Sequence, residues 1–521
     1  MPIYKTYNFW NYIIDESPFV LQRAKEVLTH KSYNFDTKQN EYEIYWQEEY
    51  GPEVEGIQTK TLRYPAGLTN YLRSKINLEL IEPENPYYQY TDKEIKAVFE
   101  DAQKHNQDFE IRDYQIEMVR VPTTRFASLI LSGVGSGKSS AMSLLIKLLK
   151  NDKVLVMNGN NFILQQIYDR LVSFGEIDIS WNPSKDPDYS KRIILINTKL
   201  SDSKLNKQDS DYIQFLSEVD TWITDECHRM QALTGFEPLF YMDPTKLQHI
   251  VGYSGSPYRN HKNIYTTAED FRLTALLGEP AFSYEMKDTV EKGTIAKPYA
   301  YFISYNNRPA YLPPDLENNY FMLYRANIIY NKNRNAAGVE MLKFLHKNDI
   351  KTIASFNNIK PGQNIMKSLK EAGIPALFIC GDETIYEWIY NKRGTLKLEK
   401  RSGTPNDIKK ALLEDNYNIV IASQVLDEGV DIDIFQCAVL FSANKSNIGV
   451  LQRIGRASRK RKNGENISLV VDFKDVGGHY IFQNHYNERK KLMIDSGIEV
   501  FERVQDFISL VKEIGNGKGF S

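Results

Sequence analysis

Cysteine is scarce in this chain, which has three, Cys227, Cys380 and Cys437, among 521 residues. They lie far apart and show none of the short spacings of metal-ligand pairs, so reduced thiols of a cytoplasmic protein are the simplest interpretation. No apolar run reaches the ~18 residues of a membrane span. The first seven residues lack the basic segment and apolar stretch of a secretory signal. These absences predict a cytoplasmic protein without a membrane partner.

An excess of positive charge is missing as well, because 65 Lys and Arg are balanced by 67 Asp and Glu, a formal net charge of −2. A polyanionic partner would therefore have to bind in a local groove and not through the overall field of the protein. Internal repeats and low-complexity segments are also absent. The length of 521 residues and a hydrophobic content of 42% favour three or four globular domains.

The chain does contain a glycine-rich loop between a predicted buried strand, residues 126–131, and a predicted helix, residues 141–149. In that context backbone N–H groups and the helix N-terminus can bind phosphate, a lysine can reach the β- and γ-phosphates, and a serine hydroxyl can ligate Mg²⁺. A chance glycine turn is the alternative, since Ser132 stands where the strict pattern has glycine. The residues predicted to bind a nucleotide here are Gly133, Val134, Gly135, Ser136, Gly137, Lys138, Ser139 and Ser140, with Lys138 also catalytic and Ser139 a Mg²⁺ ligand.

Two adjacent acids follow another predicted strand, residues 221–224. Asp225 is placed to hold Mg²⁺ through water, and Glu226 to polarise the water that attacks the γ-phosphate. An ordinary acidic strand end is the alternative. A further strand, residues 250–253, leads into the Ser-Gly-Ser of residues 254–256. Because open α/β sheets bind ligands at the carboxyl ends of their strands, we expect these segments to meet at one edge.

The second half of the chain supplies arginines. Arg456 and Arg459 are three residues apart and share one helical face. Their forked guanidiniums suit phosphate geometry, and they could act as arginine fingers across a domain cleft. A solvated basic helix is the alternative. Upstream, residues 423–431 follow another predicted strand, and Gly429 and Asp431 could sense a nucleotide at the same cleft.

Strand and helix candidates alternate along most of the chain, which favours two parallel-sheet α/β domains. The predicted strands cover residues 126–131, 154–157, 193–196, 221–224 and 250–253 in the first half and 352–355, 376–380, 419–422, 438–441 and 468–471 in the second. The predicted domains are a small α+β domain over residues 1–100, two α/β domains over 101–295 and 296–480, and a helical tail over 481–521.

The first hundred residues are acidic, with 11 Lys and Arg against 16 Asp and Glu. A hairpin-like alternation is found around residues 42–46 and 57–64, and a helix follows the Tyr-Pro-Ala-Gly-Leu of residues 64–68. An acidic domain cannot be the main electrostatic anchor for a nucleic acid. It could still recognise a junction if Tyr45 or Trp46 stacked on an exposed base pair. The alternative is that Trp46 fills the core of this domain.

In their order along the chain these motifs resemble those of superfamily 2 helicases. Residues 225–228 are similar to the DEAD/DEAH box, 254–256 to the third motif, 423–431 to the fifth and 452–459 to the sixth. The resemblance implies two tandem RecA-like domains, ATP and Mg²⁺ as cofactors, and a nucleic acid as partner. It implies an adenine-reading segment with Arg112 and Gln115, catalysis by Lys138, Asp225, Glu226, Gln452, Arg456 and Arg459, and nucleic-acid contacts by Asn160, Asn161, Thr198, Arg259, Ser355, Phe356 and Ser423.

A finer resemblance, to the UvsW-like branch of phage recombination helicases, rests on the small N-terminal domain with residues 64–68 and on the Ser-Gly-Ser motif. It implies an ATP-driven helicase or translocase that remodels branched DNA with 3′-to-5′ movement. Its implied partner is DNA in preference to RNA. It also implies a phage-encoded, monomeric protein or one that associates with replication and recombination proteins. The alternatives are a double-strand DNA translocase without strand separation, an RNA helicase, and a nucleotide-gated clamp without turnover. Residues 385–400 are expected to lengthen a loop.

Overall fold

The computed structural model places most of the chain in two compact units, residues 1–133 with 137–284 and residues 134–136 with 285–521. Of the predicted site residues, Val134, Arg259, Gly429 and Asp431 lie outside the described residues. The described residues are 2–4, 8–14, 18–34, 39–54, 57–82, 84–133, 135–183, 185–228, 233–255, 258, 264–265, 267–308, 319–380, 384–391, 394–402, 410, 417–423, 434–443, 447–460 and 466–515.

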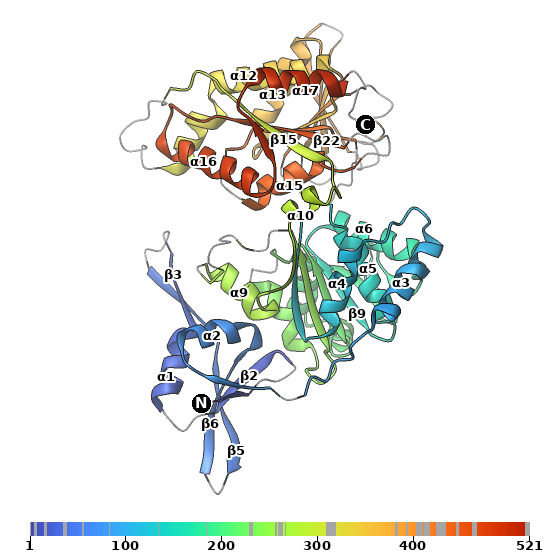
Figure 1. Ribbon diagram of the computed structural model, residues 1–521, viewed down its shortest axis with the longest axis vertical. Coiled ribbons are helices and arrows are strands. Elements are labelled where there is room, and N and C mark those ends of the chain that lie inside the picture. Colours follow the sequence, from blue (N-terminus) through green and yellow to red (C-terminus); the bar gives the residue numbers. More distant parts are fainter. Residues whose placement is uncertain are drawn as a thin grey trace. The chain divides into compact units, whose positions relative to one another are not determined.

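The first unit contains a seven-stranded sheet in which all neighbouring strands run parallel (Figure 1). Alternate residues of β9 point to opposite faces, with Val154 and Val156 in one apolar cluster and Leu155 and Met157 in another. Helices therefore cover both faces, as the predicted strand–helix alternation requires. In sheet order the strands are β10 (Ile179–Ser180), β11 (Ile193–Asn197), β9 (Val154–Asn158), β12 (Thr221–Asp225), β13 (His249–Ser254), β8 (Ala127–Ser132) and β14 (Pro280–Tyr284).

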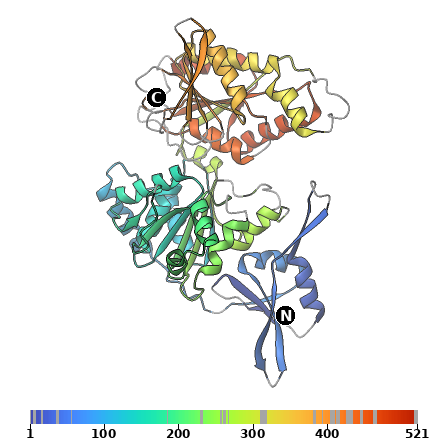
Figure 2. The ribbon, with the colours of Figure 1, turned by 180° about the vertical axis from the view of Figure 1, so that it is seen from behind.

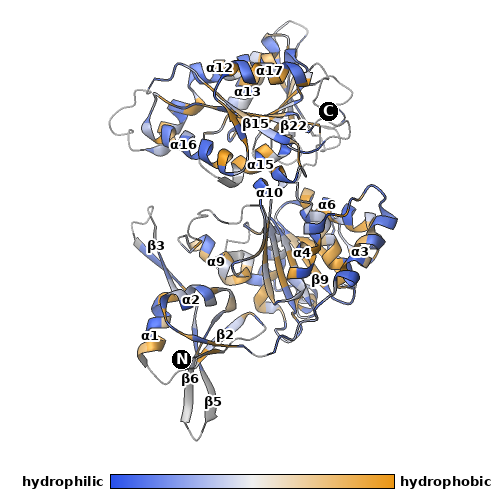
Figure 3. Ribbon diagram, in the orientation of Figure 1, coloured by the Kyte–Doolittle hydropathy of each residue, from blue (hydrophilic) through white to orange (hydrophobic). Residues whose placement is uncertain are grey.

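The helices of this unit form two layers, which Figure 3 shows as ribbons with hydrophobic residues gathered toward the sheet. The first four lie on one face and the last three on the other. They are α3 (Asp92–His105), α4 (Asp113–Thr123), α5 (Lys138–Leu148), α6 (Asn161–Ser173), α7 (Thr198–Asn206), α8 (Ser210–Leu216) and α9 (Ala268–Leu277). The sheet and its two layers are the RecA-like domain that the sequence predicted.

The N-terminal part of this unit is a small α+β domain. Its five-stranded sheet has the order β5 (Gln47–Val54), β6 (Ile57–Pro65), β2 (Trp10–Ile14), β1 (Pro2–Tyr4) and β7 (Glu79–Ile81). Strands β3 (Thr29–Asn34) and β4 (Gln39–Ile44) form a separate hairpin, and the helices are α1 (Pro18–Val27), η1 (Ala66–Leu68) and α2 (Thr69–Lys75). The predicted pairing of 42–46 with 57–64 is wrong, because β4 pairs with β3 and β6 pairs with β5 and β2. Alternation identifies a strand but not its partner.

The N-terminal domain shares its core with α9 (Figures 1 and 2). Phe271 and Ala275 of α9 are buried among the apolar side chains of the small domain. The Tyr45 ring lies 4.8 Å from the Phe271 ring, so it is occupied in this interface and is not an exposed wedge. Trp46 is partly buried in the same cluster, and its Nε1 donates to Thr29 Oγ1 at 3.1 Å. The core interpretation of Trp46 is therefore confirmed.

A glycine and an ion pair fix this contact. A Cβ atom on Gly67 would lie 2.1 Å from the carbonyl oxygen of Thr274 in α9, so the backbones approach too closely for a side chain. Arg272 donates from Nε and Nη2 to the two carboxylate oxygens of Glu43, at 2.9 and 3.0 Å. The glycine of residues 64–68 thus serves as the point of attachment to α9.

The second unit contains a nine-stranded sheet. Its order is β19 (Leu396–Ser402), β18 (Thr384–Tyr390), β17 (Ala376–Cys380), β20 (Ile419–Ala422), β16 (Thr352–Ser355), β21 (Cys437–Leu440), β22 (Ile467–Phe473), β15 (Lys297–Ile303) and β23 (Glu499–Phe501). Every pair is parallel except those made by β18 and β19. Its helices include α10 (Met286–Glu291), α11 (Tyr320–Tyr324), η4 (Arg325–Ile329), α12 (Lys332–Lys347), α13 (Ile359–Glu371), α15 (Asn447–Ala457), α16 (Tyr480–Asp495) and α17 (Val504–Gly515). All ten predicted strands are present to within two residues at either end.

Two expectations about this unit change. Residues 385–400 were expected to form a longer loop, but they form the antiparallel hairpin β18–β19, which extends the sheet at one edge. Trp388 of this hairpin donates from Nε1 to the carbonyl of Gln363 in α13, which anchors it. The helical tail includes a strand, because β23 pairs with β15. The buried side chains of Phe507 and Val511 place α17 in the core of the second unit.

Candidate functional site

The glycine-rich loop leads directly into α5 at the carboxyl end of β8. Gly135 and Gly137 have φ angles of +78° and +80°, a region that favours glycine. A Cβ atom on Gly137 would lie 2.2 Å from Nε2 of Gln115, so a side chain there would also displace the end of Gln115. With α5 beginning at Lys138, the N–H groups of its first turn are free of helical partners. The loop therefore has the form of a phosphate cradle.

The lysine of this loop contacts the predicted general base. Lys138 Nζ lies 3.4 Å from Glu226 Oε1 and donates to the carbonyl oxygen of Ser132 at 3.3 Å. The side chains of Lys138 and Glu226 are 14% and 12% exposed, so the pair is largely shielded from water yet reachable. A bound phosphate group would compete with Glu226 for the same lysine. Glu226 would then be available for its predicted role, which is to polarise the attacking water.

The pKa values of the two acids shift in opposite directions. Burial, and then the neighbouring Glu226 charge, raise the pKa of the Asp225 carboxyl to about 6. Burial alone would also raise the pKa of Glu226, but the Lys138 charge and the His228 contact hold that pKa below its ordinary value. Glu226 has a φ of 50°, a left-handed conformation that costs roughly 1–2 kcal/mol for a residue with a side chain. An ionised carboxylate held in a strained position is typical of a functional group.

The end of β13 supports Glu226. Ser254 Oγ donates to Glu226 Oε2 at 3.3 Å and lies 3.2 Å from His228 Nδ1, which is itself 3.4 Å from the same carboxylate oxygen. Asn158, at the end of β9, donates from Nδ2 to the carbonyl oxygen of Asp225 at 2.6 Å. The predicted meeting of these strand ends is thus present, and Asn158 is an addition to which no sequence pattern pointed.

The predicted adenine-reading residues lie beside the loop. The buried Gln115, in the first turn of α4, donates from Nε2 to the carbonyl oxygen of Gly137 at 3.5 Å. Arg112 precedes α4 and donates from Nη1 to Tyr114 Oη at 3.0 Å, with Glu110 Oε2 at 3.8 Å from its Nη2. Gln115 therefore links the base-recognition segment to the phosphate loop.

The residues at this edge fit ATP with Mg²⁺. The φ > 0 glycines and the lysine suit phosphate oxygens, while Ser139 and Asp225 offer the hard oxygen ligands that Mg²⁺ prefers. Among the described residues no group of three or more His, Cys, Asp or Glu side chains could hold a metal ion by itself. Magnesium usually takes one or two protein ligands together with substrate phosphates, so this small donor set suits it.

Predicted nucleic-acid contacts in the first unit lie at two helix N-termini. Asn160 caps α6 by accepting from the N–H of Phe162, and Asn197 caps α7, whose first residue is Thr198. Asn197 Nδ2 donates to Asn161 Oδ1 at 2.7 Å, which ties the two caps together. Each cap accepts a backbone N–H of the first turn through its side-chain oxygen, which fixes where α6 and α7 begin.

In the second unit the residues predicted to contact nucleic acid are more buried than those of the first unit. Phe356 follows β16, is 5% exposed and stacks on Phe441 with ring centres 4.3 Å apart. Its side chain is buried because Phe441, at the end of the neighbouring strand, offers a partner ring, and its contact with nucleic acid stays a prediction. Ser355 and Ser423 are also buried, at the ends of β16 and β20. Asn357 and Asn358 are the more exposed neighbours.

Of the two predicted arginine fingers, Arg456 lies in the last turn of α15, whereas Arg459 lies beyond this helix, which ends at Ala457. The prediction that the two arginines share one helical face is therefore wrong. Arg456 and Arg459 are partly exposed, whereas Gln452 is buried. Sequence reasoning missed Arg453, which is buried, hydrogen-bonds Ser442, and donates from Nη2 to Asn357 Oδ1 at 3.1 Å. Its neighbours in sequence have the same charge, so no pattern separates the structural arginine from the exposed ones.

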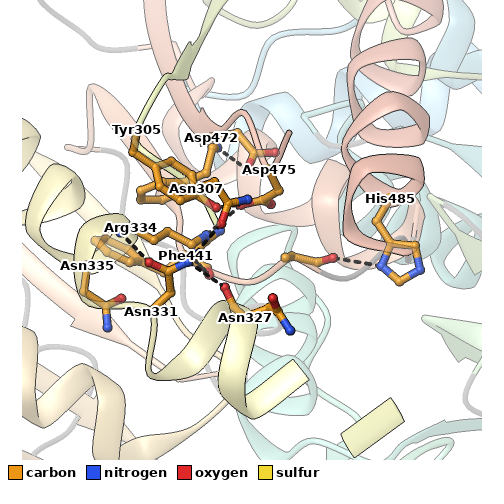
Figure 4. Close-up of polar contacts among 12 residues, drawn as sticks. Tyr305, Asn307, Asn327, Asn331, Arg334, Asn335, Phe441, Asp472, Asp475 and His485 are labelled. Atoms are coloured by element: carbon orange, nitrogen blue, oxygen red, sulfur yellow. Dashed lines mark hydrogen bonds and ion pairs between the residues drawn. The ribbon is translucent and has the colours of Figure 1, made fainter. Parts of the chain in front are cut away.

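A buried charged network, also missed, holds this part of the second unit (Figure 4). Arg334 Nε donates to Asp475 Oδ1 at 2.9 Å, and Arg489 donates from Nε to Asp472 Oδ2 at 2.8 Å and from Nη2 to Asp475 Oδ2 at 3.0 Å. Tyr305 Oη donates to Asp475 at 2.7 Å. Because all four charged side chains are at most 1% exposed, this network is structural.

Two family models match separate parts of the chain. The model described as Type III restriction enzyme, res subunit, matches residues 108–276. The model described as CRISPR-associated nuclease/helicase Cas3, C-terminal, matches residues 348–462. The first match includes the phosphate loop and the two acids, and the second includes β16 and the arginines of α15.

Among known proteins, the chain is similar to a protein assigned as helicase 22 of Sulfolobus islandicus filamentous virus (isolate Iceland/Hveragerdi). The two are 25% identical over 475 residues, which cover 85% of this chain and 75% of the viral protein. The chain is also 32% identical over 94 residues to ATP-dependent DNA helicase mph1 of Aspergillus oryzae. That alignment covers 18% of this chain and 8% of the fungal protein.

Solved structures share the fold. Saccharomyces cerevisiae Dbp5, bound to RNA and ADP BeF3, matches with a TM-score of 0.52 and 11% identity over 81% of this chain and 97% of its own. T4 UvsW matches over 96% of this chain and 98% of its own, with 16% identity and a TM-score of 0.40. The first likeness shows the fold alone, and the second is too distant to support an assignment. No described helix is both long and apolar enough to cross a membrane.

Proposed function

We propose that this chain hydrolyses ATP at the start of α5 and uses the cycle to move along and remodel DNA. The premise is that the chain belongs to the superfamily 2 helicases and is an ATP-dependent enzyme that acts on nucleic acid. The observation that carries the proposal is the cluster of Lys138, Glu226 and Ser254 at adjoining strand ends, beside a loop whose glycines leave room for phosphate.

Each residue of the cluster has a proposed role. The N–H groups of residues 135–139 and the ammonium of Lys138 bind the phosphates, and Ser139 and, through water, Asp225 hold Mg²⁺. Magnesium, when bound, neutralises charge that develops on the phosphate oxygens. Glu226 orients the attacking water and accepts its proton, and Ser254 fixes the carboxylate for that transfer. Gln115 joins adenine recognition to the loop.

The arginines of the second unit complete this proposal. Arg456 and Arg459 would stabilise the transferring phosphoryl group, with Gln452 in support, and Gly429 and Asp431 would respond to the nucleotide. We also propose functional domains over residues 1–100, 101–295, 296–480 and 481–521. Their borders are those of the sequence prediction, and the N-terminal domain would serve substrate recognition.

DNA is the proposed partner, with branched DNA such as forks and junctions as the substrate. The fungal relative is named an ATP-dependent DNA helicase, which supports DNA. Asn160, Asn161, Thr198, Arg259, Ser355 and Ser423 would contact the strand through backbone or side chain, contacts that position without reading sequence. The viral relative supports a virus-encoded protein. The proposal places this protein in the host cytoplasm, as a monomer or with replication and recombination proteins.

A second candidate is a duplex DNA translocase that does not separate strands. The match of residues 108–276 to a restriction-enzyme subunit favours it. Both candidates share the same ATP chemistry, so only the nucleic-acid product distinguishes them. Strand displacement from a labelled fork would support the helicase, and translocation on a duplex without displacement would support the second candidate.

The test of the ATP site itself is the rate of ATP hydrolysis with and without DNA, in the wild-type chain and in Glu226→Gln. The proposal requires stimulation by DNA in the wild type and its loss in the variant, with nucleotide binding retained. A variant that hydrolyses ATP at the wild-type rate would remove Glu226 from its role.

A further inference from the structure

Three side chains of the second unit form an exposed stack. The guanidinium carbon of Arg325 lies 5.4 Å from the ring centres of both Phe321 and Tyr330, and its Nη2 donates to Tyr330 Oη at 3.3 Å. Phe321 is 60% exposed and Tyr330 50% exposed. Single exposed apolar residues are ordinary, but two aromatic rings that contact the same arginine form an organised cluster. Such a cluster is suited to a flat ligand.

The stack is built on a π-helical turn, η4, which follows α11. Such turns are rare and occur often at functional sites. Tyr324, the last residue of α11, accepts hydrogen bonds at its Oη from Asn357 Nδ2 at 3.4 Å and from the N–H of Ala443 at 3.3 Å. These bonds fix the turn to the carboxyl ends of β16 and β21, the edge of the sheet where ligands of this fold class bind.

A small cavity of about 20 Å³, room for about one water molecule, adjoins the turn. Ile328 and Ile329 of η4 line it, together with Asn335, Asn357, Asn358 and the Phe356–Phe441 stack. Arg334 also lines the pocket; it is 1% exposed, and its Nη2 has no hydrogen-bond partner among the described residues. A buried guanidinium N–H without an acceptor is costly, and one water molecule in this cavity would supply that acceptor, so Arg334 keeps its structural role.

The charge of the segment narrows the class of ligand. Residues 319–339 contain three basic side chains, Arg325, Lys332 and Arg334, and no acidic one. Exposed aromatic rings beside an arginine match a nucleobase and its phosphate. Stacking on any base is sequence-tolerant, which suits a protein that moves along a strand.

We propose that Phe321, Arg325 and Tyr330 form a base-stacking site for single-stranded nucleic acid. The inference rests on the proposed function, since it assigns this strand contact to the proposed motor. It adds base contacts to the backbone contacts of the strand ends. A strand with bases should therefore bind more tightly than one without them, and the difference should depend on the two rings.

The test compares oligodeoxythymidine with an abasic strand of equal length at one salt concentration, by fluorescence anisotropy. Stacking is worth ~1–3 kcal/mol per base, so Phe321→Ala with Tyr330→Ala should weaken binding of the thymidine strand by about 5-fold or more. Binding of the abasic strand should change little. The matched control is Tyr390→Ala, which removes a 55% exposed aromatic ring on β18, outside the stack.

ATP hydrolysis without nucleic acid serves as the check that the double variant is folded, because neither ring belongs to the proposed ATP site. Unchanged thymidine binding by the double variant would overturn the inference and leave the stack as a contact for a protein. Equal losses on both strands would also overturn it, since they would indicate an effect without base specificity. If the wild type binds neither strand and shows no DNA-stimulated hydrolysis, the proposed function fails as well.

Discussion

The two parallel sheets present different chemistry at the same edge. In the first unit the strand ends bring together Lys138, Asp225 and Glu226. In the second, the strand ends and α15 join Asn357 to Arg453 at 3.1 Å. Both edges have the geometry that binds ligands in open α/β folds. Among the described residues only the first edge has a lysine and carboxylates poised for hydrolysis, so one fold serves two purposes, nucleotide chemistry and, we propose, nucleic-acid binding.

The charged clusters of the two units differ in access as well as in composition. Lys138 and Glu226 are 14% and 12% exposed, whereas Arg334 and Asp475 are at most 1% exposed. A functional charge needs a path for its ligand, and a structural charge needs only its partner. Exposure to solvent therefore distinguishes the functional cluster from the structural one. The following substitutions test that distinction, in order from the largest expected effect to the smallest.

Arg456→Ala should reduce DNA-stimulated ATP hydrolysis by ~10³-fold, the low end of arginine-finger effects, with nucleotide binding retained. Steady-state hydrolysis and nucleotide titration measure the two. The control is Lys460→Ala, an exposed cation just beyond α15, which should be silent. Equal effects of both substitutions would mean that α15 contributes general positive charge and no specific contact.

Arg334→Met should lower the free energy of unfolding of the second unit by about 3–5 kcal/mol, because it leaves Asp475 buried with one cation fewer. Denaturant unfolding measures this loss. Lys343→Met on the same helix, α12, removes an exposed partner of Glu340 and should cost less than about 1 kcal/mol. Comparable costs would contradict the structural assignment of the buried network.

Glu226→Gln should reduce hydrolysis by ~10²-fold or more while ATP still binds, as expected for loss of a general base. The matched control is Glu218→Gln, which removes one charge from the more exposed ion pair with Lys153. Hydrolysis by the control should be close to wild type. A loss of nucleotide affinity in Glu226→Gln in place of turnover would assign Glu226 to binding.

Gly67→Ala should weaken the attachment of the N-terminal domain by about 1–3 kcal/mol, because its Cβ atom has no room against Thr274. Limited proteolysis of the small domain and unfolding measurements report the change. Ser74→Ala, on the exposed side of α2, is the control. If Gly67→Ala leaves both readouts unchanged, the close approach of the two backbones is not a constraint.

Ser254→Ala should reduce hydrolysis by about 2- to 10-fold, the scale of one ordinary hydrogen bond, because the bond to Glu226 is long at 3.3 Å. Ser128→Ala is matched to it, since Ser128 lies on the adjacent strand β8 and its hydroxyl has no partner among the described residues. A larger effect of Ser128→Ala than of Ser254→Ala would contradict the support assigned to Ser254.

The sequence predicted the parts of the fold that depend on local pattern. The ten strands, the glycine loop before α5 and the convergence of Glu226 with Ser254 follow from periodicity and from the rule for parallel sheets. The roles of the site residues remain predictions, and the finer resemblance to the UvsW-like branch remains a proposal.

The features that were missed depend on partners distant in sequence. Nothing near Arg334 indicates Asp475, 141 residues away, and nothing near Phe271 indicates that it completes the N-terminal core. The burial of Phe356 was missed for the same reason, because its partner Phe441 belongs to another strand end. The shared core also affects experiments, since removing residues 1–90 would expose Phe271, so point substitutions test the small domain more cleanly.

The central claim is that ATP hydrolysis at the edge of the first sheet is coupled to a nucleic acid. The most direct measurement is the ATPase rate of the full chain with single-stranded DNA, duplex DNA, synthetic junctions and RNA compared side by side, each with wild type and Glu226→Gln. The account predicts stimulation by DNA, greatest with junctions, that Glu226→Gln abolishes. A rate that no nucleic acid changes, or stimulation that survives in Glu226→Gln, would contradict it.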